Sequence, residues 1–595
     1  MPSLADSKRS KLDAVGRHAL LVRCGGRSCS GVLLDGDPDG LDWRPDGALV
    51  LVPGMLLHGL GVLDSNKSAG GGKIVIRRRA IPALSVVLRR GSIKPRAVSP
   101  PLSAGEPSVG AGLSTPPPLE DDLAEVQARV LVAWRWPKLA AALPQVLAEL
   151  RLSSDTVGLE SSAAEQWPSL QPTIRDASTC DDSSREVRAL LSMFLLLQLQ
   201  PVPEQRAGLG PVTDTLRRLL PRVPGVPPRG AAVCTASAPL GAPGLLGAVC
   251  QGVVSGAAAG GVLTLTDARV TPGCEGAGVY NLAAAAAALP CAVVLSPLTW
   301  WRGEAVGFTL CLGLRRLLFD AVLQLELRAR AAGRRPRPAL PPTAPAFDGD
   351  ATDDVDLYGI DNSVVLVRCA HMWGSGVVVG KMGNPGRPVI LTCAHVLVED
   401  RGVTVCWGEH SLPAVVVWRS ADGEPFDVAV LEIVADNPLV HELRPLTLDC
   451  RPPRVGEPVI AAGFPLFSER SAADPGRVLR PLVSRGEVSG WWTSASSQIL
   501  TTCNVQSGAS GGPLLRPGPD KPTVVGVLVC NAQVGSGKDA VVYPHVNFAL
   551  WADAIEGPVN SYLKSGDKEH LTQLQCKSKA VHRQWKLQPP SMCKL

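Results

Sequence analysis

The sequence carries little charge for its length. Charged residues make up 19% of its 595 residues, and the formal net charge is +5. Proteins that bind nucleic acids usually have a pronounced basic excess, so this balance gives no case for a nucleic-acid partner. Apolar residues reach 45%. That content argues against global disorder and predicts several domains with buried cores.

The sequence also lacks the marks of export and of metal binding. Residues 1–24 contain no apolar core of the kind that a secretory signal needs. The 16 cysteines are scattered, without the paired CxxC spacing that is typical of metal sites. We therefore expect mostly reduced thiols in a reducing compartment, and neither a metal nor another cofactor.

One uncharged stretch is about as long as a membrane span. Ala fills much of the first half of residues 282–301, and Pro290 and Pro297 interrupt the segment. Prolines inside a helix remove hydrogen bonds, which favours a buried segment of a soluble domain over a transmembrane helix. We expect no membrane partner.

Two Pro-rich segments predict linkers. Residues 91–122 are rich in Pro, Ser and Gly, and residues 328–354 are rich in Pro and Arg and then in Asp. Both are expected to be extended and exposed. The second one separates an N-terminal domain over residues 1–327 from a C-terminal domain over residues 355–563. A polar and mobile tail over residues 564–595 is expected to follow.

The C-terminal domain shows a β pattern. Ten short apolar segments between residues 363 and 552 are separated by turn residues at regular intervals. Such a pattern predicts an all-β barrel or sandwich, which a helix over residues 549–563 would close.

The N-terminal half contains four segments that parallel segments of the C-terminal half in the same order. The parallel segments are 19–34 and 364–379, 49–57 and 389–397, 252–256 and 486–490, and 270–280 and 505–515. We infer that the N-terminal half is a decayed copy of the C-terminal fold.

Three residues of the C-terminal half supply the groups of a serine hydrolase, which needs a nucleophile, a base and an orienting carboxylate. Ser510 lies in the glycine-rich run SGASGGP, and His395 follows an apolar strand in VILTCAHV. Asp427 begins FDVAVLEI, where apolar neighbours would keep the carboxylate partly buried. Asp422 and Asp436 are nearby competitors for that role.

Glycines around Ser510 predict the remaining part of such a site. Gly508 can take backbone angles that other residues cannot, so its N–H and that of Ser510 could point into one oxyanion hole. Gly511 and Gly512 would leave room for a substrate chain. Because strands flank the serine, this is not the strand–turn–helix nucleophile elbow of α/β-hydrolases.

The order His, Asp, Ser within a β-rich domain is the chymotrypsin-type order. On these motifs, on GFPL before the serine and on VNFAL after it, residues 360–555 resemble the trypsin-like serine proteases of the HtrA/Deg type. The resemblance implies the catalytic roles of His395, Asp427 and Ser510, and the oxyanion role of Gly508 and Ser510. It implies an all-β fold of two chymotrypsin-like double β-barrel domains, the N-terminal one degenerate, with few helices.

The N-terminal copy lacks the catalytic groups. In the register of the parallel segments, Met55 replaces the histidine and Glu275 replaces the serine, and the aspartate position falls near Met193. Methionine cannot accept a proton, so we predict an inactive partner domain that serves packing, substrate docking or oligomer contacts.

The C-terminal tripeptide Cys593-Lys594-Leu595 is a variant of the peroxisomal address Ser-Lys-Leu. With the protease motifs and the long N-terminal half, it makes the chain similar to peroxisomal proteases that process imported matrix proteins. This resemblance implies a matrix location, binding of an import receptor, removal of N-terminal leader peptides, cleavage of fatty-acid oxidation enzymes after Cys, and self-cleavage. A homo-oligomer is a further hypothesis.

The resemblance to trypsin-like proteases implies that Asn504, six residues before Ser510 in the sequence, lies at the base of the specificity pocket. An amide cannot pair with a basic substrate side chain as a carboxylate would, so we expect a neutral, small-to-medium residue before the scissile bond. Two alternatives stay open at this point. One is a non-cleaving peptide-binding or chaperone module on a protease fold, and the other is an exported digestive protease.

Overall fold

A computed structural model describes most of both halves of the chain. The described residues are 12, 14–34, 48–57, 60, 63–65, 74–76, 81–89, 123–147, 150–152, 189–199, 209–258, 261–283, 289–301, 304–331, 358–383, 386–399, 401–434, 437–465, 478–492, 496–518, 521–534, 541–576 and 578–585. The linker predicted over 91–122 and the C-terminal tripeptide lie outside them.

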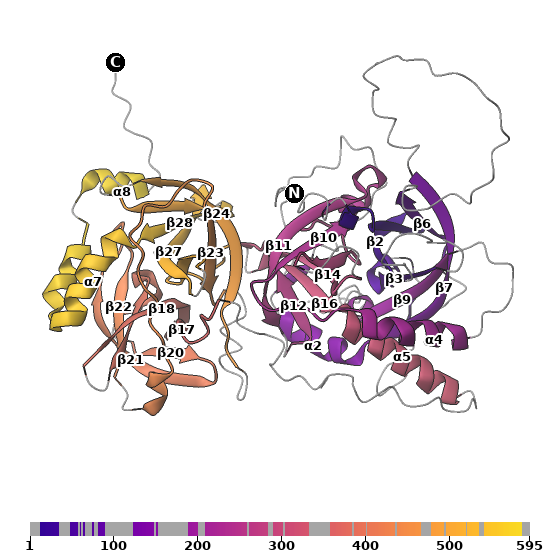
Figure 1. Cartoon of the computed structure of the whole chain (residues 1–595), viewed down its shortest axis with the longest axis horizontal. Helices are drawn as coiled ribbons and strands as arrows, with labels where there is room; N and C mark the ends of the chain where they lie inside the picture. Colours follow the sequence, from indigo (N-terminus) through magenta and orange to yellow (C-terminus); the bar gives the residue numbers. More distant parts are fainter. Residues whose placement is uncertain are drawn as a thin grey trace, which may run out of the picture.

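The C-terminal half forms two closed six-stranded antiparallel barrels (Figure 1). The strands of the first barrel are β17 (Val364–Cys369), β18 (Met372–Met382), β19 (Arg387–Thr392), β20 (Val403–Trp407), β21 (His410–Arg419) and β22 (Ala429–Ile433). The strands of the second barrel are β23 (Pro458–Gly463), β24 (Leu482–Trp492), β25 (Gln498–Thr501), β26 (Pro513–Arg516), β27 (Thr523–Val534) and β28 (Val541–Trp551). The β-branched and leucine side chains of these strands fill the cores, where Val364, Ile390 and Leu431 are fully buried.

The N-terminal half repeats this architecture. Its first closed barrel contains β1 (Leu20–Cys24), β2 (Arg27–Leu33), β3 (Leu49–Pro53), β6 (Leu84–Arg89), β7 (Leu123–Arg135) and β9 (Met193–Leu199). The second barrel contains β10 (Ala232–Ser237), β11 (Ala248–Ala258), β12 (Leu263–Thr266), β13 (Gly278–Asn281), β14 (Ala292–Trp301) and β16 (Thr309–Gly313). It closes through the pairing of β13 with β14, and β8 (Leu150–Leu152) and β15 (Glu304–Ala305) extend its sheet.

All four barrels arrange their six strands in the same order around the ring: first, second, third, sixth, fifth, fourth. The parallel sequence segments also fall on equivalent strands, since 19–34 forms β1 and β2 as 364–379 forms β17 and β18. The all-β class with a degenerate N-terminal pair of barrels is therefore confirmed. A separate hairpin of β4 (Leu63–Ser65) and β5 (Ile74–Ile76) stands outside the barrels.

The helices lie at the outer sides of the barrels (Figure 1). They are α2 (Pro137–Leu147), α4 (Leu209–Leu219), α5 (Leu314–Ala331), α7 (Asp553–Ser565) and α8 (Lys579–Trp585). An ion pair between Arg217 and Glu326 joins α4 to α5. Helix α5 runs four residues into the linker predicted from residue 328, because the alanines there still favour helix. Among the described residues no helix is long and apolar enough to cross a membrane, and the second half of the uncharged stretch forms β14.

The expected polar tail is partly folded. Residues Lys568–Leu574 form the 3-10 helix η12, and α8 follows it. Leu571, Leu574 and Val581 are buried in the core of the C-terminal half, and the Trp585 indole N–H donates to the Ser496 carbonyl at 2.9 Å. A few widely spaced apolar residues thus anchor this segment to the core. Because they form no regular pattern in the sequence, its folding was not predicted.

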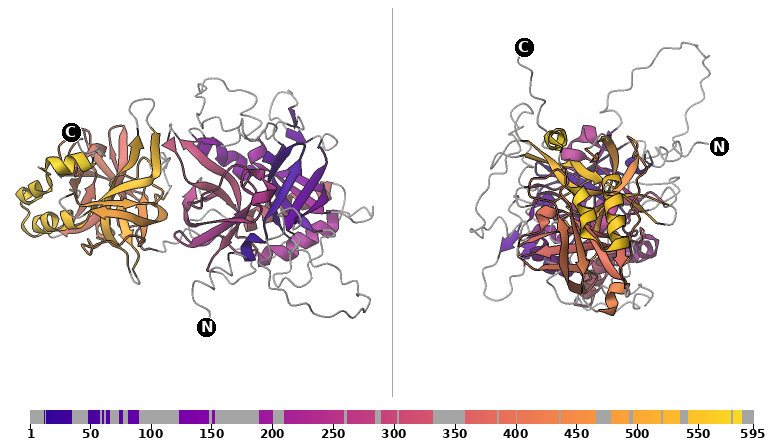
Figure 2. Two further views of the ribbon diagram at one scale, coloured as in Figure 1. Left: turned by 90° about the horizontal axis from the view of Figure 1, so that it is seen from above. Right: turned by 90° about the vertical axis from the view of Figure 1, so that its left-hand side faces the viewer.

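The two halves lie side by side, with α7 and α8 at the end away from the N-terminal half (Figure 2). At the boundary, β11 of the N-terminal half packs beside β24 of the C-terminal half. The buried guanidinium of Arg229 pairs with Asp361 and donates to the Pro481 carbonyl at 3.0 Å. A charge held this way ties the N-terminal half to both C-terminal barrels.

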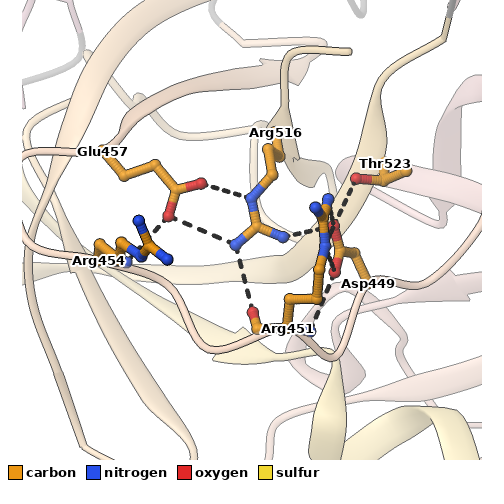
Figure 3. Close-up of polar contacts among 6 residues, drawn as sticks. All are labelled: Asp449, Arg451, Arg454, Glu457, Arg516 and Thr523. Atoms are coloured by element: carbon orange, nitrogen blue, oxygen red, sulfur yellow. Dashed lines mark hydrogen bonds and ion pairs between the residues drawn. The ribbon is translucent and has the colours of Figure 1, made fainter.

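A buried carboxylate fastens the connection between the two C-terminal barrels (Figure 3). Asp449, which precedes β23, pairs with Arg516 of β26 and with Arg451 at 2.6 Å, and it accepts a hydrogen bond from the Thr523 hydroxyl at 2.9 Å. Arg516 in turn pairs with Glu457. The network holds the second barrel's first strand against β26 and β27.

Candidate active site

His395 and Asp427 meet at the ends of two paired strands. Strand β19 pairs with β22 so that Thr392 lies opposite Ala429. His395 lies three residues after Thr392 in a short 3-10 helix, η9 (Ala394–Val396), and Asp427 lies two residues before Ala429. The imidazole Nδ1 contacts Asp427 Oδ2, and the His395 backbone N–H donates to Asp427 Oδ1 at 3.0 Å. The carboxylate therefore holds both the ring and the backbone of the histidine.

The competing aspartates lie elsewhere. Asp422 pairs with Arg419 on the surface, where 84% of its side chain is exposed. Asp436 lies outside the described residues. The register of β19 and β22 selects Asp427, which the apolar neighbours favoured.

Ser510 approaches the same place from the second barrel. It lies between β25 and β26, and its carbonyl accepts a hydrogen bond from the Ser375 N–H of β18 at 2.8 Å. A Cβ placed on the adjacent Gly511 would lie 2.8 Å from the backbone N of Cys393, two residues before His395. The serine loop and the histidine strand are thus in direct contact across the two barrels.

The Ser510 hydroxyl donates to the Val529 carbonyl at 3.3 Å. Within the described residues no hydrogen bond joins Ser510 to His395. Catalytic hydrogen bonds are often long or misaligned in a substrate-free enzyme, so this geometry does not argue against a proton transfer between them.

The turn around Gly508 presents two backbone N–H groups that donate no hydrogen bond within the described structure. Gly508 has φ of +93°, and a Cβ there would lie 2.6 Å from the Phe464 carbonyl oxygen. Neither the Gly508 N–H nor the Ser510 N–H donates to an acceptor among the residues that the structure describes. Two free N–H groups in a rigid turn are the arrangement that an oxyanion hole needs.

Ser375 holds this turn in place, and sequence reasoning missed it. Its buried hydroxyl donates to the Gly508 carbonyl at 2.7 Å and accepts from the Phe464 N–H at 2.8 Å. It thereby links β18 of the first barrel to the turn before Ser510. Its position between Gly374 and Gly376 was the available signal, because that spacing marks a close backbone approach.

A metal does not suit the cluster. Potential ligand atoms of Cys393, His395 and Asp427 lie within 4.8 Å of one another. The Cys393 thiol, however, is buried and donates to the Leu528 carbonyl at 3.2 Å. Burial raises the pKa of this thiol well above its usual 9.0, so the thiolate that a metal requires is disfavoured.

The equivalent positions of the N-terminal half carry no such groups. Strand β3 pairs with β9 so that Val52 lies opposite Leu195, as Thr392 lies opposite Ala429. The same offsets lead to Met55 and Met193 in place of the histidine and the aspartate. Both methionines pack against the core of the first barrel.

Comparisons with known proteins agree with this architecture. The family described as "Trypsin-like peptidase domain" matches residues 374–527, a range that contains His395, Asp427 and Ser510. The mouse "Peroxisomal leader peptide-processing protease" is 29% identical over 72% of this chain and 71% of its own length. The human protein of that name is 30% identical over 72% of this chain and 71% of its own length.

The chain belongs to the peroxisomal leader peptide-processing protease family. As a member of that family with a trypsin-like peptidase domain, it is a serine endopeptidase. Among solved structures it is similar to a serine endoprotease from Yersinia pestis, with 23% identity, a TM-score of 0.26 and coverage of 35% of this chain and 64% of that chain. A structure from M. tuberculosis has 22% identity, a TM-score of 0.25 and coverage of 35% and 89%.

Proposed function

We propose that Ser510, His395 and Asp427 are the nucleophile, base and orienting carboxylate of this endopeptidase, with the N–H groups of Gly508 and Ser510 as its oxyanion hole. The observation that carries the proposal is the His395–Asp427 pair beside a serine loop whose two N–H groups have no acceptor in the described structure. A protein that merely bound peptides would have no use for this combination.

In this mechanism the Ser510 hydroxyl turns from the Val529 carbonyl toward His395 Nε2. As Oγ bonds to the peptide carbonyl carbon, Nε2 takes the hydroxyl proton, and the carbonyl oxygen becomes negative within reach of the two N–H groups. His395 then passes the proton to the leaving amine as the C–N bond breaks. A water, deprotonated by His395, hydrolyses the resulting ester and restores the Ser510 hydroxyl. Asp427 keeps the proton on Nδ1 and stabilises the imidazolium.

The proposed substrates are peroxisomal matrix proteins. The names of the mouse and human relatives support removal of leader peptides from imported proteins. We extend this to a location in the matrix, to cleavage of fatty-acid oxidation enzymes, and to an import receptor that reads Cys593-Lys594-Leu595. A homo-oligomer remains part of the proposal.

The proposed preference before the scissile bond is an uncharged residue, with Cys as the best. Asn504 is buried, its backbone N–H donates to the Ser484 hydroxyl at 2.7 Å, and its side-chain oxygen accepts from Gln506 Nε2 at 2.7 Å. An amide in this position offers no negative charge to a Lys or Arg side chain.

The proposed domains are a degenerate protease over residues 1–327 and an active one over residues 355–563. The substitutions at Met55, Met193 and Glu275 support an inactive N-terminal half that acts by packing and by contacts with the active half.

The test uses a peptide panel that spans a leader cleavage site and varies the residue before the scissile bond. The full chain should cleave the Cys peptide fastest, and Ser510→Ala should cleave none of the panel. Fastest turnover of the Lys or Arg peptide would contradict the assigned preference. Binding of the panel without cleavage by either protein would favour the chaperone alternative.

Self-cleavage has its own test. The wild-type chain and Ser510→Ala are expressed side by side and compared on a denaturing gel after storage. Fragments in the wild-type sample alone support self-cleavage. Identical bands in the two samples would dismiss it.

A further inference from the structure

Two buried side chains just before Ser510 hold polar atoms that have no hydrogen-bond partner in the described part of the chain. Asn504 and Gln506 are 5% and 2% exposed, and they share a hydrogen bond of 2.7 Å. Asn504 Nδ2 and Gln506 Oε1 have no hydrogen-bond partner among the described residues. A buried amide group without a partner is costly, so such groups usually await a ligand or a water.

Two more side chains complete this cluster from neighbouring strands. Asn531 of β27 donates to the Val505 carbonyl at 2.9 Å, and its Oδ1 has no partner in the part of the chain that is described. Nδ1 of His545 on β28 likewise has no hydrogen-bond partner among the described residues. We call Asn504, Gln506, Asn531 and His545 the specificity cluster.

The N-terminal half reaches the specificity cluster directly. Gly307 follows β15, and a Cβ placed on it would lie 2.7 Å from Asn504 Oδ1 and 2.6 Å from Cε1 of His545. The backbone of Gly307 takes no left-handed angle. What forbids a side chain there is therefore the contact with these two residues and not the backbone conformation.

Two further contacts of the N-terminal half reach chain segments next to the cluster. Asp267 Oδ2 accepts from the Arg485 N–H of β24 at 2.7 Å, and Arg269 donates to the Thr502 carbonyl at 3.3 Å. Thr502 lies two residues before Asn504. The N-terminal half is thus bonded to β24 and to the chain that leads into the serine loop.

Burial and the nearby Arg269 keep the imidazole of the cluster uncharged. Burial, together with the positive charge of Arg269, lowers the pKa of His545 to about 4. His545 is consequently neutral at neutral pH, and its ring can both donate and accept a hydrogen bond. A cationic substrate side chain would meet Arg269 nearby without a compensating carboxylate in the cluster.

We propose that the N-terminal half, through Gly307, completes the substrate-specificity site of the C-terminal protease, and that the specificity cluster binds an uncharged side chain able to exchange hydrogen bonds. This inference rests on the proposed function of Ser510. It assigns the inactive barrels a part in substrate selection, which explains why Asn504 and His545 pack against Gly307 of the N-terminal half as well as against their own barrel.

The test compares Gly307→Ala with Gly225→Ala in the full chain. Gly225 lies in the same half, has no left-handed angle, and a Cβ on it would meet no atom within 4 Å. Each variant is assayed for kcat/KM on the peptide panel and for the rate at which a fluorophosphonate without a peptide side chain labels Ser510. The melting temperature is recorded for each.

For Gly307→Ala we expect kcat/KM to fall roughly tenfold or more on the best peptide, because mispaired polar groups strongly weaken discrimination. Labelling should stay within about twofold of wild type, and Gly225→Ala should match wild type in both assays. Unchanged peptide kinetics in Gly307→Ala would overturn the proposal. An equal loss of labelling would also overturn it, because the effect would then lie at Ser510.

A double-mutant cycle separates a local contact from general damage. In the His545→Ala background, Gly307→Ala should cost less in kcat/KM than it does alone, because the ring that meets the new Cβ is gone. If the losses in kcat/KM of Gly307→Ala and His545→Ala simply added up, the two residues would not interact and the proposed contact would be contradicted. A wild-type chain that fails to label at all would instead refute the proposed function of Ser510, so the two failures are distinguishable.

Discussion

The carboxylate of Glu275 accepts a hydrogen bond from the backbone N–H of Gly273 at 2.7 Å. These residues correspond in the repeat to Ser510 and Gly508, and Gly273 and Gly508 have φ of +89° and +93°. The turn whose two N–H groups have no acceptor among the described residues of the C-terminal half is therefore kept in the N-terminal half, where a carboxylate of the chain itself occupies it. This internal occupant shows that the turn can bind a carboxyl oxygen through its backbone N–H.

The first prediction concerns pH and Glu275. Burial raises the pKa of Glu275 above its ordinary 4.5, although hydrogen bonds from Glu275 and Gly273 N–H groups oppose the shift. The folded state thus binds the proton more tightly than the unfolded state, and stability falls as pH rises from 4.5 through the folded pKa. Glu275→Gln should remove this fall. Melting temperatures of both proteins across that range test it, and parallel curves would contradict it.

The second prediction concerns the orienting carboxylate. Asp427→Asn should lower kcat by about 10⁴-fold, because the amide no longer fixes the tautomer of His395 or stabilises its charged form. Asp422→Asn is the matched control in the same loop and should cleave as wild type does. If the two variants lost equal activity, Asp427 would not be the triad member.

The third prediction concerns the turn at Gly508. Gly508→Ala should lose at least about 100-fold in kcat, because the new Cβ would meet the Phe464 carbonyl and displace the N–H donors. Gly383→Ala is the control, since Gly383 also has a positive φ, +71°, but a Cβ there meets no atom within 4 Å. Peptide hydrolysis measures the difference. Similar activity in the two variants would contradict the role assigned to the Gly508 turn.

The fourth prediction concerns the network of Asp449 in Figure 3. Burial alone would raise the pKa of Asp449, but hydrogen bonds from Arg451 and Arg516 outweigh it and hold the pKa far below its usual 3.8. The ionised form therefore contributes stability above pH 3.8 that is lost as pH falls through the folded pKa. Asp449→Asn should cost about 2 kcal/mol at neutral pH, because the mostly buried Arg516 then keeps only Glu457 as a carboxylate partner.

Urea unfolding of Asp449→Asn at pH 7 and at the lowest pH where the wild type folds measures this loss. The difference in unfolding free energy between Asp449→Asn and wild type should be smaller at the lower pH than at pH 7. Glu125→Gln, which removes an exposed partner of Arg23, should stay within about 0.5 kcal/mol of wild type at both. A difference for Asp449→Asn that did not depend on pH would contradict an electrostatic origin.

Much of the β architecture could be predicted because its strands are short apolar runs between turn residues. Two strands of the C-terminal half escaped that pattern. Strand β26 begins at Pro513 directly after the glycines of the serine loop, so it resembles a continued turn. Strand β20 has five residues next to the polar hairpin that leads into β21. Pairing with long neighbours, which no local pattern reveals, makes both of them strands.

The candidate site could be predicted where a residue lies in a recognisable sequence motif. Ser510 and His395 carry motifs of their own, whereas Asp427 was one of three aspartates, and the register of β19 and β22 decides its contact with the histidine. Ser375 and Gly307 contact residues that lie at least 89 positions away in the sequence. Such contacts follow from the packing of barrels against each other, which the sequence alone does not specify.

The most direct measurement is the site of covalent labelling by a fluorophosphonate. The full chain is labelled at neutral pH, digested and mapped by mass spectrometry, beside His395→Ala and Ser510→Ala. We predict one adduct, on Ser510, that forms at least about 1,000-fold more slowly in His395→Ala and is absent in Ser510→Ala. An adduct on another residue, or equal labelling of Ser510 without His395, would contradict it.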